Sequence, residues 1–189
     1  MAILHQATLS PTKLELIADW LPGQPWFRGS AESIQLIGAY RFDDPDGAVG
    51  VETHLVGVDG PVLTVLQVPV TYRDAPLAEA QDALIGTMEH SVLGPRWVYD
   101  GLGDPVYRRT LAATIETAGS QAALDIQTPD GLVRRDPTTR VQGSGGAVPD
   151  ADAVEVIRVV DPAQPAPSSA HLTGTWPGQD APVLLAYVR

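Results

Sequence analysis

Hydrophobic and polar residues alternate along three stretches in the first half of the chain, at positions 33–42, 49–58 and 62–72. A period of two is typical of strands that bury one face. The turn signals between these stretches, at residues 43–47 and at Asp59-Gly60, predict two consecutive hairpins.

The second and third stretches differ in whether polar residues occupy one of their two faces. In 49–58, Glu52, His54 and Val56 share one face. In 62–72 both faces are largely apolar, so we expect this strand to be central and covered on both sides. Pro69 lacks an amide donor, which predicts a bulge or a sheet edge at that position.

Helical spacing begins near the N-terminus. Thr12 and Glu15 form a capping-box pattern ahead of an apolar face, and Pro22-Gly23 stops the helix. We therefore expect a short N-terminal helix.

A clearer helix is predicted from residue 105 to about residue 118. Asp104 is its expected N-cap, Pro105 occupies the first helical position and Gly119 is placed as a C′ glycine. The residues expected to pack this helix against the sheet are Tyr107, Leu111 and Ile115.

Strand candidates outnumber helices along the rest of the chain, and most are joined by short turns. They lie at residues 84–90, 96–100, 131–141 (broken at Pro137), 153–160, 171–176 and 182–188, with loops at 142–152 and 161–169. We predict an α+β fold: a curved, largely antiparallel β-sheet with one principal helix packed on it and a short N-terminal helix. No linker divides the chain, so residues 1–189 are expected to form a single domain.

The charge balance narrows the possible partners. The 189 residues include 23 Asp and Glu against 12 Lys and Arg, a formal net charge of −11. Such a surface repels nucleic acid and anionic lipid, so we expect neither as a partner. The chain has no run that is long and apolar enough for a signal peptide or a spanning helix, and we expect it to be cytoplasmic.

Missing residue types exclude more chemistry than any motif suggests. The chain has no Cys and no Asn, and Lys13 is its one lysine. Disulfides, thiolate nucleophiles and Cys-ligated zinc are therefore excluded. His5, His54 and His171 have no ligand spacing, so we expect no metal and no cofactor. The Gly101-Leu102-Gly103 run before Asp104 is interpreted as a tight turn rather than a dinucleotide loop, because Asp104 would oppose a pyrophosphate.

Two groups of residues are candidates for contacts with other molecules. Glu89 and His90 precede a turn, with Arg96 after it, and turn side chains commonly reach a partner. Because neighbours on a strand point to opposite faces, Glu89 and His90 are not expected to form an acid–base pair. A structural role is favoured for them, either hydrogen bonding of the hairpin or a domain contact. The aromatic candidates are Trp26, Trp97 and Tyr99, although Trp26 with its neighbours is favoured as a core plug.

Five segments carry a family resemblance. They are Pro-Trp-Phe-Arg-Gly at 25–29, Val-Pro-Val-Thr-Tyr-Arg-Asp-Ala-Pro-Leu at 68–77, Ala-Leu-Ile-Gly-Thr-Met-Glu-His at 83–90, Arg-Trp-Val-Tyr-Asp-Gly at 96–101 and Asp-Pro-Val-Tyr at 104–107. Together they resemble the N-terminal cap domain of actinobacterial maltokinases and related glucosamine kinases, over about residues 20–123. The resemblance implies a mostly β domain that packs beside the N-lobe of a kinase phosphorylating maltose or an amino sugar with ATP.

The chain departs from that family in its catalytic parts. It ends at Arg189, which leaves no room for a kinase lobe, and phosphoryl transfer needs Asp and Asn ligands for magnesium that a chain without Asn does not supply. We therefore expect a free-standing, non-catalytic cap-like protein.

Three hypotheses for its function stay open. The first is an accessory protein of sugar metabolism that binds another protein, such as a separately encoded kinase. The second is a small-molecule module for a carbohydrate-like ligand, with a pocket lined by aromatics such as Trp26, Trp97 and Tyr99. The third is an enzyme of unrecognised chemistry using Glu89, His90 or Asp100.

Overall fold

The computed structural model describes residues 2–4, 7–128 and 131–189. Within them, an antiparallel seven-stranded sheet, here called the main sheet, has the strand order β2-β6-β7-β5-β4-β3, with β12 also paired to β5. Its strands are β2 (Leu9–Ser10), β3 (Ile34–Phe42), β4 (Gly50–Val58), β5 (Thr64–Arg73), β6 (Leu84–His90), β7 (Gly94–Asp100) and β12 (Val159–Val160).

Strand β5 is central and buried on both faces, as the sequence predicts. It pairs with β4 from Thr64 to Tyr72 without a register shift. On its other edge it pairs with β7 from Val70 onward and with β12 at Val65 and Leu66. Pro69 lies between these two partners, so the expected irregularity is a stretch of open edge and not a bulge.

Two smaller sheets complete the β structure. The second sheet has the order β10-β13-β14-β11, with β10 (Arg140–Gly143), β11 (Val154–Val156), β13 (His171–Trp176) and β14 (Gln179–Val188). The third consists of β1 (Ala2–Leu4), β8 (Leu124–Thr128) and β9 (Gly131–Arg135), and its β1–β8 pair is parallel. Strands β1 and β8 were not predicted from the sequence. The break at Pro137 separates β9 from β10 as predicted.

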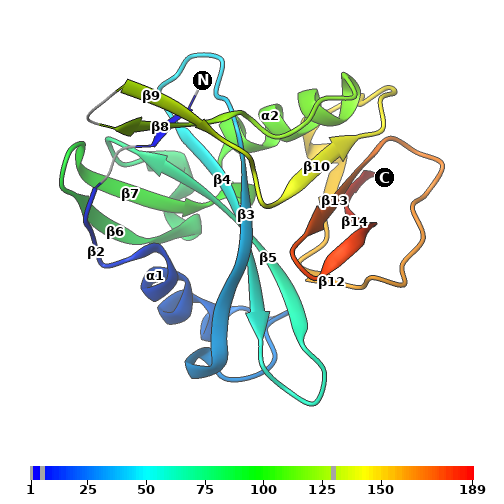
Figure 1. The fold of residues 1–189 in the computed structure, drawn as a ribbon, viewed down its shortest axis with the longest axis horizontal. Coiled ribbons are helices and arrows are strands. Elements are labelled where there is room, and N and C mark those ends of the chain that lie inside the picture. The colour runs from blue at the N-terminus through cyan, green and yellow to red at the C-terminus, as the bar shows by residue number, and fades with distance from the viewer. Residues whose placement is uncertain (1, 5–6, 129–130) are drawn as a thin grey trace.

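The main sheet is covered on both faces, and Figure 1 shows α1 and the second sheet on opposite sides of β3, β4 and β5. Helix α1 (Lys13–Trp20) begins with the predicted capping box, in which Thr12 accepts from the Glu15 amide and Glu15 accepts from the Thr12 amide. Its buried residues Leu16 and Ile17, with Leu21 after it, pack on Val56 and Val68 of the sheet.

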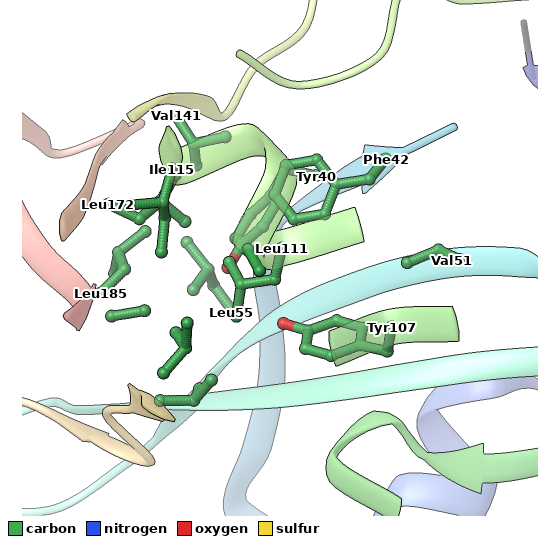
Figure 2. Packing of buried hydrophobic residues seen from close by; sticks show 14 of the residues in the cluster. Tyr40, Phe42, Val51, Leu55, Tyr107, Leu111, Ile115, Val141, Leu172 and Leu185 are labelled. Carbon is green, nitrogen blue, oxygen red and sulfur yellow. The ribbon is translucent and has the colours of Figure 1, made fainter. Parts of the chain in front are cut away.

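Helix α2 (Pro105–Glu116) fills the space between the main sheet and the second sheet. Tyr107, Leu111 and Ile115 are buried, as the sequence predicts. Figure 2 shows Leu111 of this helix beside Leu55 of the main sheet, and Ile115 beside Leu172 of the second sheet. The helix therefore joins two sheets into one core, where the sequence had predicted packing on one.

The C-terminal end of α2 differs from the prediction. The residue in the left-handed region is Ala118, with φ of 52°, and not Gly119. The Gly119 amide donates to the Thr114 carbonyl at 2.8 Å and the Ala118 amide to Ile115 at 3.4 Å. This is a Schellman arrangement in which an alanine occupies the position that favours glycine.

Short 3-10 helices connect several elements. They are η1 (Leu21–Gly23), η2 (Ala31–Ser33), η3 (Ala78–Ala83), η4 (Gly101–Gly103) and η5 (Ala151–Ala153). Element η4 is the predicted turn: Asp104 follows it as the N-cap of α2, and a Cβ built at Gly103 would lie 2.2 Å from Cβ of Ala83. Close packing against Ala83 therefore explains why position 103 is a glycine. No helix in the described ranges is long and apolar enough to span a bilayer.

Candidate functional site

A pocket of about 650 Å³ opens on the α1 side of the main sheet. The start of α1, the β3–β4 loop and the β6–β7 turn surround it. Three basic side chains (Lys13, Arg41, Arg96), three acidic ones (Asp43, Asp44, Asp74), Tyr72, His90 and several apolar residues line it. The pocket thus combines donors, acceptors and apolar surface.

A polar network lies beside this pocket, between β4, β5 and the first turn of α1. Glu52 accepts hydrogen bonds through Oε2 from Lys13 Nζ at 2.5 Å and from the Tyr72 hydroxyl at 3.0 Å. His54 Nε2 lies 3.0 Å from the same hydroxyl. Glu52 and His54 are both buried, and strand alternation places them on one face, as the sequence predicts.

The chemistry of the network selects one tautomer of His54. Ionised Glu52 only accepts, so the Tyr72 hydroxyl gives it its single proton. The Tyr72 oxygen then accepts from His54, which places the imidazole proton on Nε2. Nδ1 of His54 is left as a buried acceptor without a hydrogen-bond partner among the described residues.

Burial and charge shift the pKa values of this network in different directions. Burial alone would raise the pKa of Glu52, but the charges of His54, Lys13 and Arg41 together lower it. Burial lowers the pKa of His54 to about 4, against the opposing effect of Glu52. Glu52 is therefore ionised and His54 neutral at pH 7, while burial and the Glu52 charge raise the pKa of Tyr72.

Arg41 on β3 lies in register with Glu52 on β4. Its Nε is buried and finds no hydrogen-bond partner within the part of the chain that the structure describes. A Cβ built at Gly50 would lie 3.2 Å from Cδ2 of Tyr72 and 3.6 Å from Nη2 of Arg41. The absence of a side chain at Gly50 therefore keeps the space beside the guanidinium open.

The structure brings two of the six sequence candidates into the pocket lining, His90 and Arg96. Nδ1 of His90 accepts from the amides of Val92 at 3.2 Å and Leu93 at 3.1 Å, which is the hairpin bonding that the sequence favours. Glu89 is exposed and pairs with Ser10 of β2 across the sheet. It is not among the pocket residues, so Glu89 and His90 face apart as expected.

The three aromatic candidates lie elsewhere. Trp26 packs edge-on against Trp20 with ring centroids 5.8 Å apart, and the Arg158 guanidinium lies 5.1 Å from its ring centroid. Trp97 is half-buried on β7. Tyr99 is fully buried, and its hydroxyl accepts from the Leu77 amide at 2.8 Å, so it does not reach a partner's surface. None of these three candidates lines this pocket.

Sequence reasoning did not select Lys13, Arg41, Glu52, His54 or Tyr72 as site residues. Two signals pointed to three of them, and none pointed to Arg41 or Tyr72. Glu52 and His54 are polar residues two apart on a face that otherwise carries apolar residues such as Val56, and Lys13 is the sole lysine. Their convergence was not readable, because it depends on which strand pairs with β4 and on where α1 docks.

The β6–β7 turn also exposes apolar side chains. Val92 is 56% exposed and Leu93 is 47% exposed, with Glu89 and Arg96 beside them on the two strands. These four residues are called the turn patch below.

The main sheet, its flanking helices and the pocket define a mostly β-stranded α+β domain. Residues 20–104 match the family model of the maltokinase N-terminal cap domain. The resemblance expected from the sequence is therefore confirmed over this segment, which is called the cap-like segment below. It contains Arg41, Glu52, His54 and Tyr72 but not Lys13, which comes from outside it. No curated protein matches the chain.

Proposed function

We propose that this protein is a non-catalytic accessory domain that binds another protein through the turn patch, with a separately encoded kinase of sugar metabolism as the expected partner. The observation that carries the proposal is the pair of exposed aliphatic side chains, Val92 and Leu93, at a turn within the cap-like segment. An apolar centre with charged neighbours is the arrangement found in many protein interfaces.

The turn is held in shape before any partner arrives. His90 accepts hydrogen bonds from both Val92 and Leu93, and the Ser91 amide donates to the Thr8 carbonyl at 3.0 Å. Binding through a preorganised turn loses little conformational entropy, which favours this segment as a contact site.

The chemistry of the chain supports a non-catalytic role. Lys13 and Glu52 form a Lys–Glu pair, a feature also found in protein kinases, where it acts together with Asp and Asn ligands of magnesium. This chain contains no Asn, and no three His, Asp or Glu side chains come together as a metal-binding group in the described ranges. The Lys–Glu pair here joins α1 to the main sheet.

The test is capture of partners from the native cell lysate, followed by affinity measurement with the purified partner. Val92→Ser with Leu93→Ser is expected to weaken binding at least tenfold and to leave the melting temperature within a few degrees, since exposed substitutions usually cost less than ~0.5 kcal/mol each. The matched control is Val62→Ser with Leu63→Ser, at the exposed β4–β5 turn.

Glu89→Ala with Arg96→Ala should also weaken binding, because these side chains flank the apolar centre. Equal binding by all variants would contradict the proposal, as would ATP-dependent phosphorylation of maltose or glucosamine by protein freed of contaminating kinases.

A further inference from the structure

We propose that the pocket on the α1 side of the main sheet binds a small molecule that carries an oxyanion, a carboxylate or a phosphate, with Arg41 as its principal ligand. This goes beyond a protein contact at the turn patch. It concerns the part of the pocket lining that β3, β4 and β5 contribute.

The first argument is the state of the Arg41 side chain. A guanidinium carries five N–H donors in a fork that matches carboxylate and phosphate oxygens. The Nε donor of Arg41 is buried and has no partner among the described residues. A buried donor without an acceptor destabilises the folded protein, and an oxyanion in the pocket would supply that acceptor.

Glu52, the residue opposite Arg41 on β4, does not satisfy the Arg41 guanidinium. Oε2 of Glu52 already accepts from Lys13 and Tyr72. The ion pairs within 4.0 Å that the described residues make with Glu52 come from Lys13 and His54, and none comes from Arg41. Lys13 thus balances Glu52 at close range, and the charge of Arg41 remains available to a ligand.

The second argument is space. Gly50 lies beside the Tyr72 ring and Arg41 Nη2, and a side chain at this position would fill the gap in front of the guanidinium. The cavity volume of about 650 Å³ lies within the ~300–1,000 Å³ typical of small-molecule sites.

The lining also contains three aspartates, whose charges offset those of its three basic side chains. The Asp44 carboxylate is turned to its own loop, where it accepts from the amides of Asp46, Ala48 and Val49 at 2.9 to 3.2 Å. Asp43 and Asp74 keep the pocket from being strongly positive, which disfavours polyanions.

A neutral sugar is disfavoured because, among the described lining residues, no aromatic ring offers a free face. Phe42 is buried, and Lys13 Nζ covers the Tyr72 ring at 5.1 Å from its centroid. Sugar binding commonly uses such a face for stacking.

The experiment is an NMR titration of the intact chain with inorganic phosphate, with malonate and with maltose, at constant ionic strength. We expect saturable shifts around Arg41 and Tyr72 with phosphate or malonate, and the anion that binds more tightly identifies the ligand class. Arg41→Gln should lower the affinity at least tenfold. The matched control is Arg109→Gln, at an exposed position on α2, which should leave the affinity unchanged.

Gly50→Ala provides a second variant in case Arg41→Gln fails to fold. It should also weaken binding at least tenfold, by filling the space beside the guanidinium. Val92→Ser, outside the pocket lining, should leave anion binding unchanged, which separates this proposal from the protein contact. The proposal would be overturned if neither anion bound saturably, or if both pocket variants bound the anion as tightly as the unchanged protein. Binding of maltose alone would also overturn it.

Discussion

Two buried polar networks on opposite faces of the main sheet differ in how completely their groups are hydrogen-bonded. On the α2 side, Asp104 is fully buried and accepts hydrogen bonds from Thr71, from Arg73 through two nitrogens and from the Val106 amide, all at 2.7 to 2.9 Å. On the α1 side, His54 Nδ1 and Arg41 Nε have no hydrogen-bond partner in the described ranges.

The difference separates a structural network from a candidate binding site. Burial would raise the pKa of Asp104, but the hydrogen bonds from Arg73, Thr71 and Val106 lower it, so the carboxylate is ionised and tied to α2 and β5 at once. A network whose groups satisfy one another has little to offer a ligand. A network with unsatisfied groups beside a cavity retains donors and acceptors that a ligand can use.

The largest loss of stability is expected from a substitution on the α2 side. Asp104→Ala should destabilise the protein by about 3–5 kcal/mol, because it leaves the Arg73 charge without its partner and removes the N-cap of α2. Denaturant unfolding measures this loss. Asp152→Ala removes an exposed partner of Arg108 and should cost less than ~1 kcal/mol. Similar losses for the two variants would remove the basis for calling Asp104 structural.

A smaller change in the free energy of unfolding is expected when the pH is lowered, because of His54 on the α1 side. The folded state holds the pKa of His54 at about 4, below its ordinary value of 6.5. Between these values the unfolded state binds a proton that the folded state does not, so stability must fall as the pH falls through this window. The slope due to one proton is at most ~1.4 kcal/mol per pH unit.

His54→Gln should therefore flatten the dependence of unfolding free energy on pH between about 6.5 and 4.5. Glu52, whose pKa is lowered, contributes stability that is present above its ordinary value of 4.5 and lost below it, so it adds little in this window. His171→Gln, at a half-buried position on β13 outside this network, is the matched control variant. An unchanged slope in the His54 variant would show that its burial does not determine its protonation.

The smallest effect is expected at the end of α2, and it should be stabilising. Ala118→Gly should raise the unfolding free energy by about 1 kcal/mol, because a residue with a Cβ is strained at a φ of 52°. The same change at Ala113, exposed inside α2, should lower it by about 1 kcal/mol. Thermal melts of the two variants should therefore move in opposite directions, and a shift of both in one direction would contradict the Schellman geometry.

Short sequence patterns were enough to predict a local structure where residues close in the sequence stabilise it. Thr12 and Glu15 predicted the start of α1, and Asp104 with Pro105 predicted the start of α2. The apolar face of α2 was also readable, because its period is set by the helix itself. Gly119 was misplaced by one position, since the left-handed residue is chosen by the geometry of the last turn and not by residue type alone.

The sequence by itself determined the α+β class, most strands, both helices and the absence of cysteine and asparagine chemistry. Only the tertiary structure decided that Lys13, Arg41 and Tyr72 line one pocket beside Glu52 and His54. Those residues come from α1, β3, β4 and β5, and their meeting depends on strand register and helix docking. Such long-range pairings are selected by the burial of whole faces, which no short stretch of sequence encodes.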